Sequence, residues 1–115
     1  MSKVTATKKL AGKHKGSDLL RSVPYETGFH FFIEHGKYTG ITACSIVEFA
    51  EKIEIIPIES VLFHFQRQDF QKWLRHTIGD EELAKRIDHI ETWSSGENLR
   101  KELFKRFHNR ITELQ

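Results

Sequence analysis

Hydrophobic residues recur at helical spacing through most of the chain after residue 45. Steps of three and four positions place apolar side chains on one side of a helix and leave the other side to charged residues. Successive stripes of this kind comprise Ile46, Phe49, Ala50 and Ile53; Ile58, Val61, Leu62 and Phe65; Phe70, Trp73, Leu74, Thr77 and Ile78; Leu83, Ala84, Ile87, Ile90 and Trp93; and Leu99, Leu103, Phe104, Phe107, Ile111 and Leu114. The pattern predicts about five helices. In the second stripe, the β-branched and aromatic content leaves a strand open as an alternative.

Residues 28–42 follow a different period. Phe29, Phe31 and Ile33 stand at alternate positions, which predicts a strand. A turn with two glycines follows at 35–40, and the segment 38–42 returns as a second strand. A two-stranded hairpin is marginal by itself, so it must pack on helices or pair with a second copy of the chain. We therefore expect a homodimer formed through the exposed edge of this hairpin.

Polar residues mark where the predicted helices begin and end. Ser45 and Glu48 form a capping box, which starts a helix at Ser45. Asp69 is a candidate cap for the third helix, and Gly79 in the left-handed conformation ends that helix. Asp80 then caps the next helix, whose acidic first turn complements the helix dipole.

Residues 1–22 lack sustained apolar periodicity, so the sequence predicts a flexible basic arm followed by a single domain, 23–115. Residues 1–27 hold six basic against two acidic side chains, a balance of +4, and the rest of the chain has a balance of −2. The expected fold is α+β and mostly α, with the hairpin packed on the helices. Its predicted core comprises Phe49, Leu62, Phe65, Trp73, Leu74, Ile87, Ile90, Leu103 and Phe107.

Composition narrows the class of protein. The 115 residues can bury one core but not two, and a hydrophobic fraction of 38% with 30% charged residues is typical of a globular domain. No apolar run approaches the ~20 residues of a membrane span, and the N-terminus lacks the apolar region of a signal peptide. We therefore expect a cytoplasmic protein. The single cysteine, Cys44, is expected to fill space beside a helix start.

One stretch concentrates polar residues that could carry chemistry, namely His64, Arg67, Asp69 and Trp73, with His76 one turn beyond Trp73. A tight corner between two helices would bring His64, Arg67 and Asp69 within hydrogen-bonding reach, as in sites where a carboxylate holds a catalytic imidazole. The same residues also have a structural interpretation as a helix cap, a corner ion pair and a satisfied histidine. The structural interpretation is favoured because no nucleophile or glycine-rich loop accompanies them.

Metal and cofactor binding have little support in the sequence. The chain has seven histidines, but it contains neither His-x3-His nor Cys-x2-Cys spacing. It also contains no Walker or Rossmann glycine pattern. We therefore expect no bound metal and no cofactor.

Three functional hypotheses follow. The leading one is a non-enzymatic protein-interaction module that homodimerises, with Phe63, Phe107 and Ile111 as candidate interface residues. The first alternative is nucleic-acid association through the arm and the basic residues of the last helix, which are Arg100, Lys101, Lys105, Arg106 and Arg110. The second alternative is a small-ligand or acid–base site at the His64 to Asp69 corner.

The ordered motifs of the chain resemble a known family. These motifs are His64-Phe65-x-Arg67-x-Asp69-Phe70-x-x-Trp73, Gly79-Asp80-x-x-Leu83-Ala84, and upstream Phe29 to Phe32, Gly40, Ala43 and Ser45-x-x-Glu48-Phe49. Over roughly residues 28–93 they resemble a small prokaryotic family known only as a domain of unknown function, DUF5752. The resemblance implies an archaeal or bacterial cytoplasmic protein of mostly helical build, and it implies no activity. Gln68 departs from it, since a small residue such as Gly is expected there.

Overall fold

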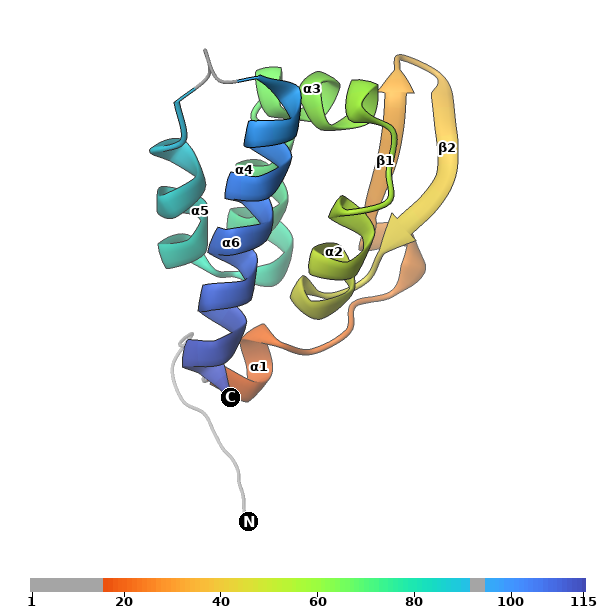
Figure 1. The fold of residues 1–115 in the computed structure, drawn as a ribbon. Helices are drawn as coiled ribbons and strands as arrows, with labels where there is room; N and C mark the ends of the chain where they lie inside the picture. Colours follow the sequence, from red (N-terminus) through yellow and green to blue (C-terminus); the bar gives the residue numbers. More distant parts are fainter. Residues whose placement is uncertain (1–15, 92–94) are drawn as a thin grey trace.

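In a computed structural model, which describes residues 16–91 and 95–115, the chain folds as a short β-hairpin packed on helices (Figure 1). The elements in chain order are α1 (Gly16–Leu19), a 3-10 turn (Tyr25–Thr27), β1 (Phe29–Glu34), β2 (Lys37–Ala43), α2 (Ile46–Ile53), α3 (Ile58–Gln66), α4 (Asp69–Trp73), a π-helical turn (Leu74–Ile78), α5 (Glu81–Asp88) and α6 (Gly96–Leu114). Five α-helices follow the hairpin in these described ranges, which confirms the predicted α+β architecture. The strand alternative for residues 58–65 is wrong.

The hairpin pairs β1 with β2 in antiparallel register, with Phe29 opposite Ala43 and Phe32 opposite Tyr38. β1 lies on the inner side and packs against α3, while β2 forms the outer edge in Figure 1. The register shifts between His30 and Phe32, where β2 carries extra residues around Gly40 at φ +88°. A bulge of this kind increases local twist and makes an outer edge a poorer partner for another strand.

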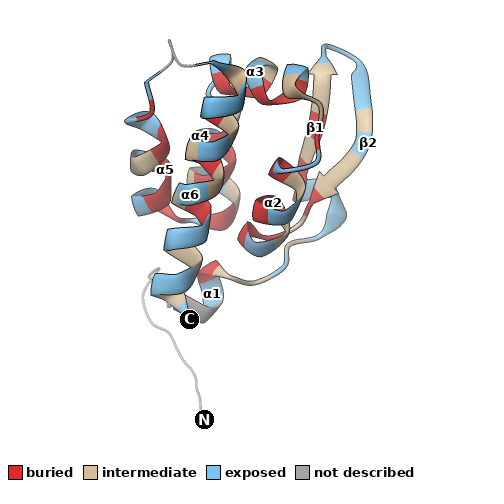
Figure 2. Cartoon of the chain, viewed as in Figure 1, coloured by how far each residue is buried: buried red, intermediate tan, exposed pale blue. Residues whose placement is uncertain are grey.

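Phe49 of α2 lies at the centre of the core. Its ring stacks on Phe107 of α6 with centroids 4.1 Å apart, and it also contacts Phe29 at 5.5 Å and Trp73 at 5.9 Å. These rings come from β1, α2, α4 and α6, so the hairpin and the helices share one core. Figure 2 shows the buried faces of these elements turned toward one another. Every predicted core residue except Leu62 is buried.

The prediction that Leu62 belongs to the core is wrong. Leu62 is 37% exposed to solvent, whereas Val61, His64 and Phe65 of the same helix are buried. The physical reason is that α3 packs against both β1 and α6, so it buries parts of two sides. A single apolar stripe in the sequence therefore does not identify its buried face.

The predicted helix boundaries are mostly confirmed. Ser45 Oγ accepts from the Glu48 amide at 3.0 Å, although the Glu48 carboxylate accepts from the amide of Cys44 at 2.7 Å rather than from that of Ser45. Gly79 has φ +93° at the end of the π-helical turn. Asp80 Oδ1 then accepts from the Leu83 amide at 3.0 Å and caps α5.

Residues 16–22, which the sequence assigns to the arm, contact the folded body. Leu19 of α1 is buried, and the Arg21 guanidinium donates to the carbonyls of Thr77 at 2.9 Å and Ile78 at 3.0 Å. The rest of the predicted arm, residues 1–15, lies outside the described residues, as does Trp93 of the fourth apolar stripe. The described part of the domain thus begins before residue 23.

Candidate functional site

The site lies at the corner between α3 and α4, where the chain changes direction (Figure 1). α3 ends at Gln66 and α4 begins at Asp69, with Gln68 between them at φ +61° and ψ +27°. This left-handed conformation is unusual for a residue other than Gly, Asn or Asp. It changes the direction of the chain at the junction of the two helices, and the polar side chains on either side of the junction contact each other.

His64 connects this corner to the hairpin. Its Nε2 accepts a hydrogen bond from the backbone N–H of Phe32 at 2.8 Å, and its Nδ1 lies 2.8 Å from Asp69 Oδ2. Because the Phe32 amide can only donate, Nε2 must be the acceptor and the ring proton must sit on Nδ1, which donates to the carboxylate. Both nitrogens of His64 are therefore occupied.

Burial controls the charge of His64. The side chain is almost fully buried among aromatic rings, including Phe29 with ring centroids 4.8 Å apart. Burial lowers the pKa of His64 below its ordinary value, and the hydrogen bond that His64 donates to Asp69 only partly opposes this shift. The imidazole is thus held neutral with no free lone pair, an arrangement that suits a structural support better than a general base.

Asp69 does not cap α4, so that prediction is wrong. It is the first residue of the helix, and the cap position belongs to Gln68, which makes no side-chain cap bond. The Asp69 Oδ2 atom instead accepts from His64 Nδ1 and from Arg67 Nε at 3.0 Å. The carboxylate is turned toward the buried imidazole because this places it opposite two N–H donors at once.

Arg67 spans the mouth of the corner. Its guanidinium carbon lies 5.1 Å from the centre of the Phe63 ring, in a cation–π contact, and Nη1 is 3.2 Å from His35 Nε2. Arg67 thereby links α3 to the hairpin turn. His35 in turn lies edge-on to Phe63, with ring centroids 5.5 Å apart.

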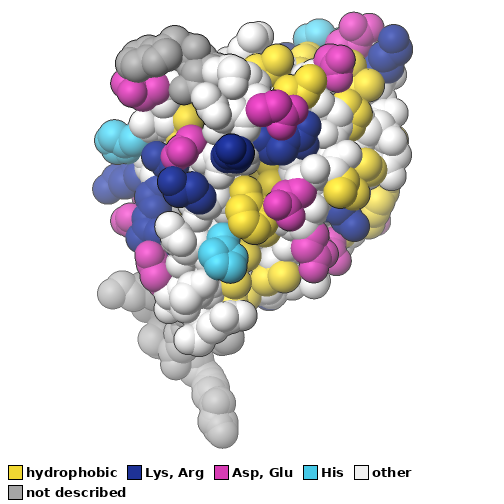
Figure 3. Space-filling model, viewed as in Figure 1, with side chains coloured by type: hydrophobic (Ala, Val, Ile, Leu, Met, Phe, Trp, Pro, Cys, Tyr) yellow, Lys and Arg dark blue, Asp and Glu magenta, His cyan; other side chains and the backbone are white. Residues whose placement is uncertain are grey.

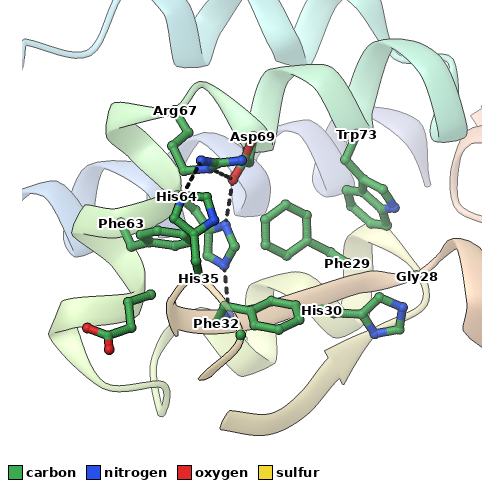
Figure 4. A pocket seen from close by; sticks show the side chains of 12 residues that line it. Gly28, Phe29, His30, Phe32, His35, Phe63, His64, Arg67, Asp69 and Trp73 are labelled. Carbon is green, nitrogen blue, oxygen red and sulfur yellow. Dashed lines mark hydrogen bonds and ion pairs between the residues drawn. The ribbon is translucent and has the colours of Figure 1, made fainter. Parts of the chain in front are cut away.

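A pocket of about 410 Å³ opens beside these residues (Figure 4). Figure 4 shows Trp73 and His30 at one end, Phe63 and His35 at the other, and the Arg67–Asp69 pair along one side. The remaining lining residues are Gly28, Phe29, Phe32, Glu34, Gly36 and His64. Aromatic rings form most of the wall, and charged groups lie at the rim.

The structure brings together His64, Arg67, Asp69 and Trp73 from the predicted cluster, all of which line this pocket. Trp73 is held by its indole N–H, which donates to the Thr27 carbonyl at 2.8 Å. His76 is exposed and is not a lining residue. The reason is that the π-helical turn adds a residue per turn after Trp73, which rotates His76 away from the Trp73 face.

The candidate interface residues have three different environments. Phe107 is fully buried against Phe49, so its assignment to an exposed interface is wrong. Ile111 is half-buried at the edge of the core. Phe63 is half-buried and lines the pocket.

The hairpin supplies the lining residues that sequence reasoning missed, above all His30, Phe32 and His35. His30 Nδ1 lies 2.7 Å from Thr42 Oγ1, which fixes its ring across the hairpin. The alternation at 28–34 indicates which side chains lie on one face of a strand, but it does not indicate that α3 lies against that strand. That contact joins residues 32 positions apart, as in the hydrogen bond from Phe32 to His64.

Comparison with known families places the chain. A family model described as a family of unknown function (DUF5752) matches residues 7–108. The chain belongs to the DUF5752 family. No curated protein and no solved structure matches it.

Membership in DUF5752 bears on the corner through Gln68. The positive φ of this residue accounts for the expectation of a small residue at this position, since Gly adopts it without strain. In this DUF5752 chain the corner nevertheless closes, as the bonds between His64, Arg67 and Asp69 show. A glycine is therefore not required for the tight geometry.

The described part of this DUF5752 domain has neither a cluster of metal-ligating side chains nor a helix suited to crossing a membrane. Among residues 16–91 and 95–115, no group of three or more His, Cys, Asp or Glu side chains could hold a metal ion. None of the helices within these ranges is long and apolar enough to cross a membrane.

Proposed function

We propose that this domain is a non-enzymatic binding module whose ligand site is the pocket beside the His64 to Asp69 corner. The ligand is a small planar aromatic molecule with a hydrogen-bond donor and an acceptor on one edge. The observation that supports this proposal is the pocket itself, whose aromatic wall is fixed by the bonds of His64 and Trp73. Concave, mainly apolar pockets with a few polar groups are typical of ligand sites.

Binding is favoured over catalysis because the polar groups already hold one another. His64 has both nitrogens occupied, and burial lowers its pKa, so it is not available as an acid or base. Arg67 is paired with the Asp69 carboxylate at 3.0 Å. Side chains with these partners hold the wall of the pocket in place. Catalysis by proton transfer would need a side chain that can gain or release a proton.

The aromatic class of ligand follows from the wall. Phe29, Phe32, Phe63 and Trp73 surround a volume of about 410 Å³, which lies within the usual range for small ligands. Planar rings gain from edge-to-face and offset contacts with such walls. The neighbouring guanidinium of Arg67 and carboxylate of Asp69 offer a donor beside an acceptor, which match the carbonyl and amino groups of an aromatic amide.

Benzamide is a suitable probe of this proposal. We expect a saturable shift of the Trp73 indole N–H resonance when benzamide is titrated into the full chain and followed by two-dimensional amide NMR. Cyclohexanecarboxamide, which keeps the amide but lacks the aromatic ring, should bind at least about tenfold more weakly. Shifts that follow the amide alone, or that spread evenly over the surface, would contradict the proposal.

A matched pair of variants tests the rim. Arg67→Leu removes the donor at the pocket mouth and should weaken benzamide binding about tenfold, because a hydrogen bond to a charged group is lost. Lys72→Leu, at an exposed position of α4, removes the same charge outside the pocket and should leave binding unchanged. Equal effects of the two substitutions would show that general charge, rather than the pocket, governs binding.

Homodimerisation through the hairpin is a second candidate function, supported by exposed apolar residues beside β2. Tyr25, Tyr38 and Ile55 are exposed and line a shallow depression together with Ile41 and Gly40. The bulge around Gly40 disfavours continuous strand pairing, so we propose a contact between two copies through these side chains. Sedimentation of the full chain at micromolar concentration should give a dimer.

A control variant distinguishes dimerisation through this surface from non-specific association of exposed apolar residues. Ile55→Asp should convert the dimer to a monomer, because it places a charge among the apolar residues that line the depression. Leu62→Asp, at an exposed apolar position on α3, should leave the dimer intact. If the unmodified chain sediments as a monomer, the dimer proposal is refuted and the pocket proposal is unaffected.

Nucleic-acid association has less support from the charges of α6. In Figure 3, basic and acidic side chains are interspersed over the surface of the molecule on which α6 lies in Figure 1. Arg100, Arg106 and Arg110 are each paired with a carboxylate, and the first two also donate to backbone carbonyls. Binding of a polyanion at low salt by a chain lacking residues 1–15, equal to that of the full chain, would exclude a role for the arm.

A further inference from the structure

Gln71 of α4 has a buried oxygen without a hydrogen-bond partner. Its side chain is 4% exposed, and no described residue donates to its Oε1 atom. Buried polar atoms in folded proteins are almost always satisfied, because an unpaired acceptor forfeits its hydrogen bonds to water. An orphaned acceptor of this kind therefore points to a donor that the protein does not itself supply.

This residue lines a second cavity, which shares no lining residue with the aromatic pocket. The cavity has a volume of about 770 Å³ and lies among α3, α4, the end of α5 and the start of α6. Leu62, Ile90 and Leu99 form its apolar part, and Gln71 and Asp88 belong to its polar part. Leu62 does not belong to the core. Its exposed side chain instead gives this cavity an apolar lining surface.

The orientation of the Gln71 amide follows from its neighbour. The pKa of Asp88 lies below its ordinary value, chiefly because of the Arg75 guanidinium and also because of the Gln71 side chain. An amide lowers a carboxyl pKa by donating an N–H to the carboxylate. Of the two polar atoms of the Gln71 amide, only the oxygen is buried without a partner, which agrees with an amino group that faces Asp88.

The charges around the cavity favour a cationic donor. Arg75 lies between Glu81 at 2.9 Å and Asp88 at 2.7 Å, so one positive charge faces two negative charges. Arg75 and Asp88 line the cavity together with Gln71, and Glu81 binds Arg75 from outside the lining, so these three charged groups carry an excess of negative charge. A ligand with N–H donors and a positive charge complements both features.

We propose that this cavity binds a primary alkylammonium group. The ammonium donates to Gln71 Oε1 near Asp88, and its carbon chain lies on Leu62, Ile90 and Leu99. Short aliphatic diamines and a lysine side chain share this chemistry. The site is independent of the aromatic pocket, since the two cavities share no lining residue.

n-Butylammonium is the probe for this site, because its amino group, like that of lysine, is protonated at neutral pH. We expect a saturable shift of the Gln71 side-chain amide resonances when the full chain is titrated and followed by two-dimensional NMR. n-Butanol has the same carbon chain and no charge. It should bind at least about tenfold more weakly, because a hydrogen bond to a charged group contributes more than one between neutral groups.

Two substitutions of glutamine by methionine complete the test. Gln71→Met keeps the side-chain length but removes the orphaned oxygen, so butylammonium binding should fall about tenfold or more while the melting temperature is maintained or raised. Gln115→Met makes the same change at an exposed position outside the cavity and should leave the affinity unchanged. Equal binding of butanol and butylammonium to the unmodified chain, or undiminished binding by Gln71→Met, overturns the proposal.

Discussion

The Nε2 atom of His64 accepts a hydrogen bond from the backbone N–H of Phe32 at 2.8 Å. A side chain of α3 thereby supplies an acceptor to an amide of β1. Two-stranded hairpins are marginal by themselves, and an unpaired amide next to an apolar core would add a further cost. This bond, together with the contact of Phe29 and Phe31 with the core, attaches the hairpin to the helices.

The first prediction concerns the dependence of stability on pH. Burial lowers the pKa of His64 in the folded state, so below about pH 6.5 the unfolded chain takes up a proton that the folded chain does not. The stability that comes from neutral His64 is therefore fully present above that pH. It is lost progressively as the pH falls toward the pKa of His64 in the folded state. Urea unfolding on either side of about pH 6.5 measures this slope.

Two variants assign that slope to a residue. His64→Gln keeps a hydrogen-bonding side chain without titrating in this range, so it should reduce the slope as well as the stability. His76→Gln, at an exposed position, should leave the slope close to that of the unmodified chain. A slope that survives in His64→Gln would mean that other groups cause the acid sensitivity.

The second prediction separates the two roles considered for Asp69. Asp69→Ala leaves the buried His64 Nδ1–H without an acceptor, so unfolding free energy should fall by about 1–3 kcal/mol. Asp69→Asn retains an acceptor oxygen and loses only the charge paired with the part-exposed Arg67, which contributes little. The Asn variant should therefore be clearly more stable than the Ala variant in denaturant unfolding. Equal losses would indicate that the negative charge, rather than the hydrogen bond, is what matters.

The third prediction concerns Trp73, which joins the core to the pocket. Trp73→Ala should lower the unfolding free energy by about 3–5 kcal/mol, because it removes a buried aromatic side chain. Trp73→Phe keeps an aromatic ring and loses the indole N–H bond to Thr27, so the loss should be about 1–2 kcal/mol. Denaturant midpoints of both variants check this, and an unchanged midpoint for the Ala variant would exclude Trp73 from the core.

The fourth prediction concerns the strained backbone at Gln68. Gln68→Gly should raise the unfolding free energy by about 0.5–1 kcal/mol, because release of the left-handed strain exceeds the entropy cost of glycine. Gln66→Gly, two residues earlier in the last turn of α3, should instead lower it by about 0.5–1 kcal/mol. Thermal unfolding of both variants gives the comparison, and the same sign for both would refute the assignment of strain to Gln68.

The fifth prediction concerns a buried ion pair between α5 and α6. Asp80 is 1% exposed, and its two carboxylate oxygens accept from Arg110 Nε at 2.9 Å and Nη2 at 3.1 Å. Arg110→Met should lower the unfolding free energy by about 3–5 kcal/mol, because it leaves a buried carboxylate unpaired. Adding Asp80→Asn to this variant should recover part of the loss, since the remaining side chain is neutral and can still cap α5.

Much of the fold was predictable from local signals. The Ser45 cap, the left-handed Gly79 and the cap at Asp80 each depend on residues within one turn of each other, and all three are present. Only the reciprocal half of the capping box differs, since the Glu48 carboxylate accepts from the Cys44 amide. The same locality explains why His64, Arg67 and Asp69 could be placed together at one corner. Asp69 was assigned the wrong role because its carboxylate has a choice between the helix amides and two nearby side chains, and only the tertiary contacts decide between them.

The sequence by itself determined the elements, most of the core and the position of the corner, because these follow from the periodicity of side chains and from short-range hydrogen bonds. The tertiary structure alone decided that α3 lies against β1, that Leu62 faces outward, and that Phe107 is buried with its ring stacked on Phe49. It also decided that hairpin residues such as Phe32 and His35 complete a pocket with α3 and α4. These outcomes depend on how separate apolar faces are oriented as they pack together, and the period of a stripe fixes a face without fixing its partner.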